Sequence, residues 1–372
     1  MLHTRAASLL DLLRAATPKQ LALALLATGA AIYMYSQAHA DGSALAGANG
    51  FGSDFHGTIW SPDRAVLHGV SPYPDPAKPF ATQPAVYLPP IFLATLPLGW
   101  LSLHVATWIW FGLLLAAAFG LLAVLDVRNP WCYALLLLSL PVEQALVLGN
   151  ASILVALGVA LAWRFRFHPI LGPLAVAATV TVKFWLWPLI IWLLIVRPRA
   201  GLLSGVLFGA LTLLAWAVIE FHGLSDYPTL MHAEGRRFAG AGVLFVAALI
   251  QLHVAVRLAA ALGILGGLVL IAAAWARRTD ELGSLSLALL AALVATPVAW
   301  PHYLVLMAVP IAIAWRTPNL AWAWFPALWI ATHEGLTHGQ VGYSLAFCLF
   351  AALPVVAVTL ARRGDAAAAP RR

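Results

Sequence analysis

The sequence predicts an all-α integral membrane protein with many membrane-spanning helices. Apolar residues make up 62% and charged residues 9% of the 372 residues, whereas a soluble domain has about 25% charged residues. The mean hydropathy is +0.89. Long apolar runs recur from residue 20 to residue 361, and they do not alternate with polar residues as the strands of a membrane barrel would.

Candidate spans follow one another along the chain, separated by short polar, glycine- or proline-containing segments. Segment 239–252 is apolar but short, and we expect it at the membrane interface. Trp185, Trp187 and Pro188 predict that segment 169–196 breaks into two short helices. The chain is therefore interpreted as one transmembrane domain, 20–361, between a terminus at 1–19 and a tail at 362–372. About 11–13 transmembrane helices are expected: 20–37, 86–101, 104–126, 131–148, 150–163, 169–196, 201–219, 254–276, 284–299, 302–315, 319–332 and 342–361.

The first apolar run partly resembles a secretory signal. Arg5, Arg14 and Lys19 precede it, and the small-residue sequence at 38–40 resembles a cleavage site. The run is longer than the usual apolar region of a signal, and more spans follow. We interpret it as a retained first span, with cleavage as the alternative.

The basic residues predict the orientation. The net charge of +7 could indicate nucleic-acid binding, but these residues lie between spans, where they favour the cytoplasmic side. Both termini are then cytoplasmic in a bacterial-type inner membrane, and loops 38–85, 220–238, 300–302 and 333–341 lie on the outer face. The alternation fails between 86 and 130, so either 86–101 or 104–126 is short or re-entrant, or Arg128 is an exception. Cys132 and Cys348 lie in separate apolar runs and are expected to be packing residues.

The outer loop 38–85 is unusually polar for this chain. Asp54 follows the first span among Gly50, Gly52 and Gly57, and Tyr87 with the following prolines marks the return to the membrane. A carboxylate held there by aromatic residues could act as a general base with a raised pKa. The alternative is a solvated loop acid, which is how we interpret Asp63 and Asp75.

Two further residues could face an anionic group. Lys183 is the single lysine inside an apolar run, and such a cation usually faces a cavity or pairs with an anion; the alternative is snorkelling to the interface. His302 follows Pro301 at the outer interface, where it could hydrogen-bond a phosphate or move a proton. The alternative for His302 is an interfacial side chain wetted by lipid headgroups.

Other polar residues are weaker candidates for the same site. Glu143 could line the outer cavity near the Gly149-Asn150 break, or could bond another helix. Arg236 and Arg237 could bind an anion or simply lipid headgroups. Arg64 is a further candidate for a phosphate contact.

The order of these motifs resembles glycosyltransferase family 87, the polyprenyl-phosphate-mannose-dependent transferases of the GT-C fold. The matching segments are "SDF" at 53–55, "GVSPYP" at 69–74, "YLPPIFLATLPLGWL" at 87–101, "GNAS" at 149–152, "VKFWLWP" at 182–188 and "TPVAWPHYLVLMAVP" at 296–310. The resemblance covers roughly residues 20–320 and rests on the order of short motifs. The chain departs from the family pattern where Asn150 replaces Gln, Phe184 replaces Pro and Tyr303 replaces a second His.

The resemblance implies that Asp54 is the catalytic base and that His302 lines the donor site. It implies transfer of a sugar, with mannose inferred from the family alone, from a polyprenyl-phosphate donor to an acceptor hydroxyl, with inversion. Phosphate is a good leaving group, so one carboxylate suffices, whereas glycoside hydrolysis needs two. Cations would stabilise the departing phosphate. The expected donor-binding residues are His302, Lys183, Arg64, Arg236, Arg237, Tyr87, Tyr303, Glu143 and Asn150.

Two other classes of function remain open. A transporter or lipid flippase would need polar residues near the midplane of several spans and often internal repeats, whereas the charges here gather on one face. An assembly or scaffold protein of the envelope would not need Asp54. We expect membrane lipids, the lipid-linked donor and a glycolipid, glycan or protein acceptor as partners, with no cofactor, metal or nucleic acid.

Overall fold

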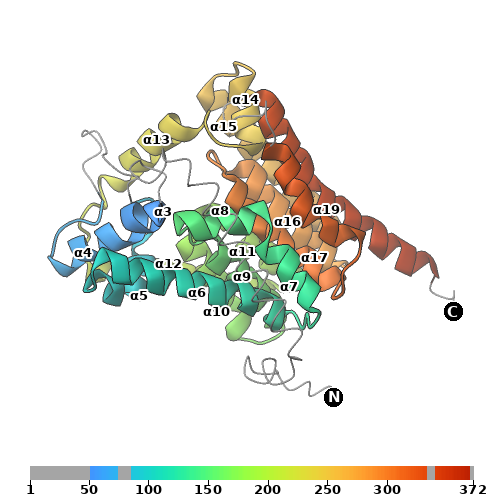
Figure 1. The fold of residues 1–372 in the computed structure, drawn as a ribbon, viewed down its shortest axis with the longest axis horizontal. Coiled ribbons are helices and arrows are strands. Elements are labelled where there is room, and N and C mark those ends of the chain that lie inside the picture. Colours follow the sequence, from blue (N-terminus) through green and yellow to red (C-terminus); the bar gives the residue numbers. More distant parts are fainter. Residues whose placement is uncertain (1–50, 74–84, 333–339, 369–372) are drawn as a thin grey trace.

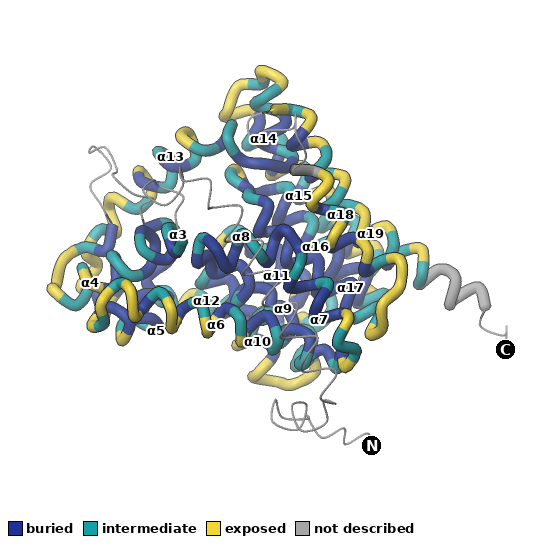
Figure 2. The backbone as a smooth tube through the Cα atoms, in the orientation of Figure 1, coloured by how far each residue is buried: buried dark blue, intermediate teal, exposed yellow. Residues whose placement is uncertain are grey.

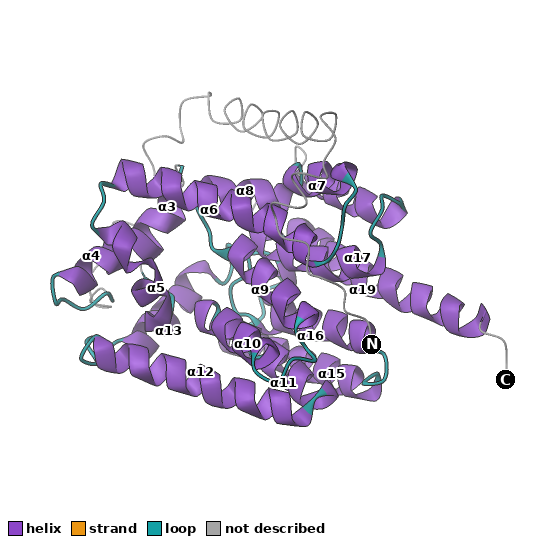
Figure 3. Ribbon diagram, turned by 90° about the horizontal axis from the view of Figure 1, so that it is seen from below, coloured by secondary structure: helices purple, strands orange, loops and turns teal. Residues whose placement is uncertain are grey.

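The computed structural model describes residues 51–73, 85–332 and 340–368. The predicted first span, the terminus at 1–19 and Asp75 lie outside these residues. Within the described part of the chain every regular element is helical, and Figure 3 shows helices joined by loops. The predicted all-α class is confirmed.

Four described helices are long and apolar enough to cross a membrane: α6 (Leu103–Val124), α12 (Pro198–Val218), α15 (Val256–Ala276) and α19 (Val341–Ala368). The helices α7 (Pro130–Leu137) and α8 (Leu140–Leu148) add a fifth crossing if this pair, bent by 61°, counts as one span. The chain is thus a multi-pass membrane protein. The described residues hold fewer full-length spans than the hydropathy predicted, because several apolar runs form shorter helices.

The helix α5 (Pro89–Gly99) explains the failed alternation between 86 and 130. Its 11 residues extend only about 16 Å, roughly half the thickness of a bilayer core. The 22 residues of α6 are long enough to cross. One of the two predicted spans is therefore short, which is one of the alternatives that the basic residues left open.

Proline or an extended residue interrupts the chain at some of the other short helices. Segment 169–196 breaks at Lys183, whose φ of −134° and ψ of 95° end α10, and Pro188 begins α11. Pro301 similarly begins a 3-10 turn rather than a long helix. These shorter elements are α9 (Ser152–Arg164), α10 (Leu171–Val182), η2 (Phe184–Leu186), α11 (Pro188–Val196), α14 (Leu244–Gln251), α16 (Glu281–Ala295), η3 (Pro301–Met307), α17 (Ala308–Ala314), η4 (Leu320–Ala323), α18 (Trp324–Ala327) and η5 (Leu328–Thr332).

The helices pack in a continuous series. α6 contacts α9, α9 contacts α10, and α10 contacts α12; α11 then joins α12 to α16, which contacts α15 and α19. Figure 1 shows α13 (Tyr227–Phe238) at the edge of this bundle, leading to α14. The broken elements α8, α9 and η3 contact one another, so the irregular backbone gathers inside the bundle.

Burial separates a central core from lipid-facing helices. Figure 2 shows buried backbone through the middle of the bundle and exposed loops at its edges. On α12, Leu202 and Val218 are 67% and 65% exposed, and on α15 Val269 is 61% exposed. Helix faces that expose many large apolar side chains are unfavourable in water. Lipid tails would cover them without cost.

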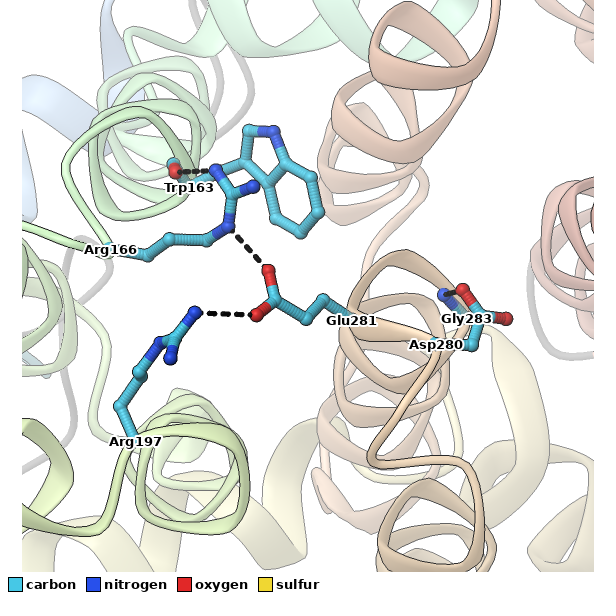
Figure 4. A network of polar contacts seen from close by, with 6 residues as sticks. All are labelled: Trp163, Arg166, Arg197, Asp280, Glu281 and Gly283. Atoms are coloured by element: carbon cyan, nitrogen blue, oxygen red, sulfur yellow. Dashed lines mark hydrogen bonds and ion pairs between the residues drawn. The ribbon is translucent and has the colours of Figure 1, made fainter. Parts of the chain in front are cut away.

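Arginines from distant loops share two carboxylates. Glu281 accepts hydrogen bonds from Arg166 Nε at 2.7 Å and Arg197 Nη2 at 2.9 Å (Figure 4). Asp126 pairs with Arg164 at 2.8 Å and Arg316 at 3.9 Å. Four arginines that the sequence places between apolar segments therefore lie in two pairs, each pair sharing one carboxylate.

Candidate active site

Asp54 lies on a short helical segment after a glycine turn. The segment consists of α3 (Ser53–Phe55), the π-helical turn η1 (His56–Trp60) and α4 (Ser61–Leu67). Gly52 precedes it with φ 75°, and a Cβ at Gly52 would lie 2.7 Å from Thr107 Cγ2. The Gly52 N–H also donates to Val147 O at 2.7 Å. These contacts hold the start of α3 against α6 and α8, and Asp54 is only 6% exposed.

The turn at residues 149–152 packs directly against α3. Gly149 ends α8 with φ 70°, which favours glycine. Its carbonyl accepts a hydrogen bond from Trp110 Nε1 at 2.7 Å, and the Trp110 ring stacks on Phe55 at 5.4 Å between centroids. The conformation of this turn therefore places Asn150 beside Asp54.

Asn150 connects Asp54 to Lys183. Its Nδ2 donates to Asp54 Oδ2 at 2.7 Å, and its Oδ1 accepts from Lys183 Nζ at 3.1 Å. All three residues are buried, with exposed fractions of 6% or less. The structure thus brings together a carboxylate, an amide and an ammonium group that are far apart in the sequence.

Lys183 does not snorkel to an interface. It is 4% exposed, and its Nζ lies 4.2 Å from the ring centroid of Tyr303 and 5.3 Å from that of Tyr87. Contacts of this kind stabilise a cation. The extended backbone at Lys183 interrupts the helix and directs the side chain inward.

His302 lies in the same buried region. It is 2% exposed and its ring approaches Tyr303 at 4.9 Å, while Tyr303 stacks on Trp185 at 4.8 Å. Within the described part of the chain, neither ring nitrogen of His302 has a hydrogen-bond partner. Because buried polar atoms are normally paired, these two nitrogens are available to a bound molecule. The alternative of a histidine wetted by headgroups does not fit its burial.

Burial and neighbouring charges act in opposite directions on Asp54. Burial raises the pKa of the Asp54 carboxyl, and the Asn150 hydrogen bond and the Lys183 charge partly offset this rise. Both Tyr87 and Tyr303 lie close enough to interact electrostatically with the carboxylate. A raised pKa makes a carboxylate a stronger base, which suits proton abstraction.

Several predicted residues are not brought to Asp54. Arg64 is exposed and lies 5.0 Å from the Trp60 ring centroid. Arg236 and Arg237 are exposed on α13, and Glu143 is half-buried on α8.

The prediction that Asp63 is an ordinary loop acid is wrong, because Asp63 is 0% exposed and accepts a hydrogen bond from Thr95 at 3.1 Å. In the described ranges, no three His, Cys, Asp or Glu side chains are grouped so as to hold a metal ion.

Ser152 and Thr58 were not predicted from the sequence. Ser152 binds Asn150 Oδ1 through both its backbone N–H and its hydroxyl, and the Thr58 hydroxyl donates to Asp54 O at 2.6 Å. An Asn followed two residues later by Ser is a signal for a local side-chain turn. That signal could have identified Ser152.

The comparison with protein families gives one match. The family model of glycosyltransferase family 87 matches residues 85–301, more than half of the chain. The protein belongs to this family and is a membrane glycosyltransferase. The match contains Asn150 and Lys183, begins after Asp54 and ends immediately before His302. No curated protein and no solved structure matches the chain.

Proposed function

We propose that this protein transfers a hexose, mannose by its resemblance to the family, from a polyprenyl-phosphate donor to an acceptor hydroxyl. The observation that carries this proposal is the buried line from Asp54 through Asn150 to Lys183, with His302 and its unpaired nitrogens beside it. A carboxylate and a cation held apart by one amide can act on opposite sides of a reacting carbon. The family membership supports the reaction type.

Asp54 acts as the general base. The acceptor oxygen attacks the anomeric carbon and forms the new C–O bond, while the bond from that carbon to the phosphate oxygen breaks. The acceptor proton passes to Asp54, and the electron pair of the broken bond leaves with polyprenyl phosphate. Attack opposite the leaving group inverts the anomeric carbon.

Lys183 and His302 stabilise the departing phosphate. Both are buried, so their interactions with an anion are screened less than at the surface. Arg64, Arg236 and Arg237 are exposed, and their role in donor binding would be confined to the approach of the lipid. The donor tail lies between helices, and the sugar is transferred at the outer face of the membrane.

Asp54→Asn tests the base. The substitution keeps the shape of the side chain and removes its ability to accept a proton, so transfer should fall at least about 100-fold. Native membranes that contain the full-length variant are supplied with labelled polyprenyl-phosphate mannose, and label in endogenous acceptors is measured.

The matched control is Asp63→Asn. Asp63 is a second buried carboxylate on the same segment, but it bonds Thr95 rather than the Asn150–Lys183 pair. We expect this variant to retain transfer at neutral pH. Equal transfer by wild type and Asp54→Asn would exclude Asp54 as the base. Movement of the labelled donor across the membrane without product would instead favour a flippase.

A further inference from the structure

The Asn150 side chain is bonded at both ends of its amide. Its Oδ1 accepts from Ser152 N at 3.1 Å, Ser152 Oγ at 2.7 Å and Lys183 Nζ at 3.1 Å. Its Nδ2 donates to Asp54 Oδ2 at 2.7 Å. Asn150 is 6% exposed and Ser152 is 2% exposed, so water competes little for these bonds.

These partners determine which way the amide points. The Ser152 N–H is a donor without acceptor capacity, and so is Lys183 in its ammonium form, so both require an oxygen opposite them. A rotated amide would place its NH2 group against both donors and its oxygen against the Asp54 carboxylate. The Ser152 contacts form a local turn at the start of α9, and this turn fixes the Asn150 side chain independently of any substrate.

The amide in turn fixes the carboxylate. Among the described residues, Asn150 provides the hydrogen bond to the Asp54 carboxylate, and it reaches Oδ2 alone. A proton taken from an acceptor therefore arrives most easily at Oδ1. The Lys183 cation polarises the amide and strengthens the bond that Nδ2 donates, because linked hydrogen bonds reinforce one another.

We propose that Asn150, held by Ser152, is a positioning residue that orients the Asp54 carboxylate and reserves its Oδ1 for the acceptor hydroxyl. This inference rests on the proposed function and changes the role of Asn150, which the sequence pattern places among the donor-binding residues. It also adds Ser152 to the groups on which the reaction depends. Neither residue touches the reacting atoms; both act through Asp54.

Asn150→Leu is the main test, because leucine has the same number of side-chain heavy atoms and no polar group. Filling the same space prevents Lys183 from moving into contact with Asp54. With labelled polyprenyl-phosphate mannose and endogenous membrane acceptors, the maximal rate per enzyme should fall about 10- to 100-fold, while KM for the donor stays within about twofold. Ser152→Ala removes one neutral hydrogen bond and should lower the rate about fivefold. A donor-binding role for Asn150 would raise KM instead.

The pH profile provides a readout that a packing role would not change. Loss of the Asn150 hydrogen bond disfavours the charged carboxylate, so the pKa of Asp54 should rise by about one unit. The acidic limb of the rate profile then moves to higher pH. Lys183, Tyr87 and Tyr303 also face Asp54, and all three are unchanged in Asn150→Leu and Ser152→Ala.

Asn129→Leu is the matched control for folding. Asn129 makes the same type of local turn, since its Oδ1 accepts from Trp131 N at 3.0 Å, but it begins α7 rather than the turn beside Asp54. Transfer and its pH profile should remain those of the wild type. A loss as large as that of Asn150→Leu would show that any such turn matters equally and would overturn the proposal.

An infrared titration separates this proposal from the proposed function. The difference spectrum between wild type and Asp54→Asn in membranes reports the protonation of Asp54 without any substrate. Its midpoint should be about one pH unit higher in an Asn150→Leu background. An unchanged midpoint would overturn the positioning role even if transfer depends on Asp54. A shifted midpoint would uphold it even if mannose is the wrong sugar.

Discussion

Asp54 and Asp63 are two buried carboxylates with different surroundings. Asp54 has an amide and a cation beside it, whereas Asp63 Oδ1 accepts a hydrogen bond from the Thr95 hydroxyl. Asp63 Oδ2 is without a partner among the described residues. Burial raises the pKa of Asp63 to about 8, and the Thr95 bond partly offsets this rise. Asp63 is therefore mainly protonated at neutral pH, and it lacks the nearby Lys183 charge that favours the anionic form of Asp54.

Asp63 should make the stability of the protein pH-dependent. Its pKa is raised from the ordinary value of 3.8 to about 8 in the folded protein, so the folded state binds the extra proton between these values. The contribution of Asp63 to stability is fully present below about pH 4 and is lost as pH rises to about 8. Asp63→Asn removes this titration. As pH rises between these two values, the stability of the variant relative to the wild type should therefore increase by up to about 1 kcal/mol per pH unit. Thermal unfolding in detergent at pH 5 and pH 8 measures the difference.

The control for this prediction is an exposed carboxylate. Glu220 is exposed, so Glu220→Gln should shift the unfolding temperature equally at both pH values. The prediction for Asp63 fails if the difference in unfolding temperature between Asp63→Asn and the wild type is also the same at pH 5 and pH 8.

At the level of residues, the sequence pointed to the polar side chains of the candidate site, but it did not show the surroundings of all of them. Lys183 was detectable because a lysine in an apolar run is rare, and Asp54 because it follows a span among glycines. The burial of Asp63 was not detectable, because it depends on the close approach of α4 to α5: a Cβ at Gly99 would lie 3.0 Å from Asp63 Cβ. The Asn150 bridge was also hidden, since it joins three residues through the packing of α3, α8 and α10.

The turn between α8 and α9 controls where Asn150 lies relative to α3. Gly149 has φ 70°, and a Cβ there would lie 2.8 Å from Phe55 Cβ. Gly149→Ala should therefore cost about 1 kcal/mol for the backbone conformation and more for displacing Phe55. Because Phe55 follows Asp54 directly, the displacement should also separate Asp54 from Asn150. We expect an unfolding temperature several degrees lower and transfer reduced about tenfold or more.

Two other glycines separate the causes of this effect. Gly69 also has a positive φ of 67° but nothing within 4 Å of its Cβ position, and Gly112 on α6 has open space and an ordinary helical backbone. Gly69→Ala should lose stability without losing transfer, and Gly112→Ala should lose neither. Transfer that survives Gly149→Ala would mean that the contact between this turn and α3 does not position the base.

Element boundaries were predictable where proline or glycine interrupts an apolar run. The break of 169–196 into two helices and the short element at 239–252 follow from such residues. The number of full crossings was not predictable in the same way. Hydropathy reports that a segment is apolar, but a buried short helix such as α5 or α16 is as apolar as a span.

At the scale of the whole molecule, one carboxylate connects three parts of the bundle. Glu281 begins α16, Arg166 follows α9, and Arg197 joins α11 to α12. Both guanidinium groups also lie 4.3 Å from the Phe167 ring centroid. The contacts in Figure 4 therefore hold the ends of α9, α12 and α16 together. Glu281 begins α16, whereas His302 follows the other end of that helix.

Glu281→Gln should weaken the assembly of these helices without changing the chemistry of transfer. The amide cannot neutralise two cations and keeps one acceptor oxygen, so the loss of stability should be about 1–3 kcal/mol. This loss should be smaller at high salt, because the side chains are partly exposed.

Asp280→Asn is the matched control, because it removes the same charge one residue away. Asparagine can still accept the hydrogen bond that the Gly283 N–H donates to Asp280 Oδ1 at 3.1 Å. Unfolding temperatures in detergent at low and high salt should fall for Glu281→Gln and stay nearly constant for Asp280→Asn, while transfer per folded enzyme stays constant in both. Equal destabilisation by the two variants would show that net charge at this end of the protein matters, and not the shared contact with Arg166 and Arg197.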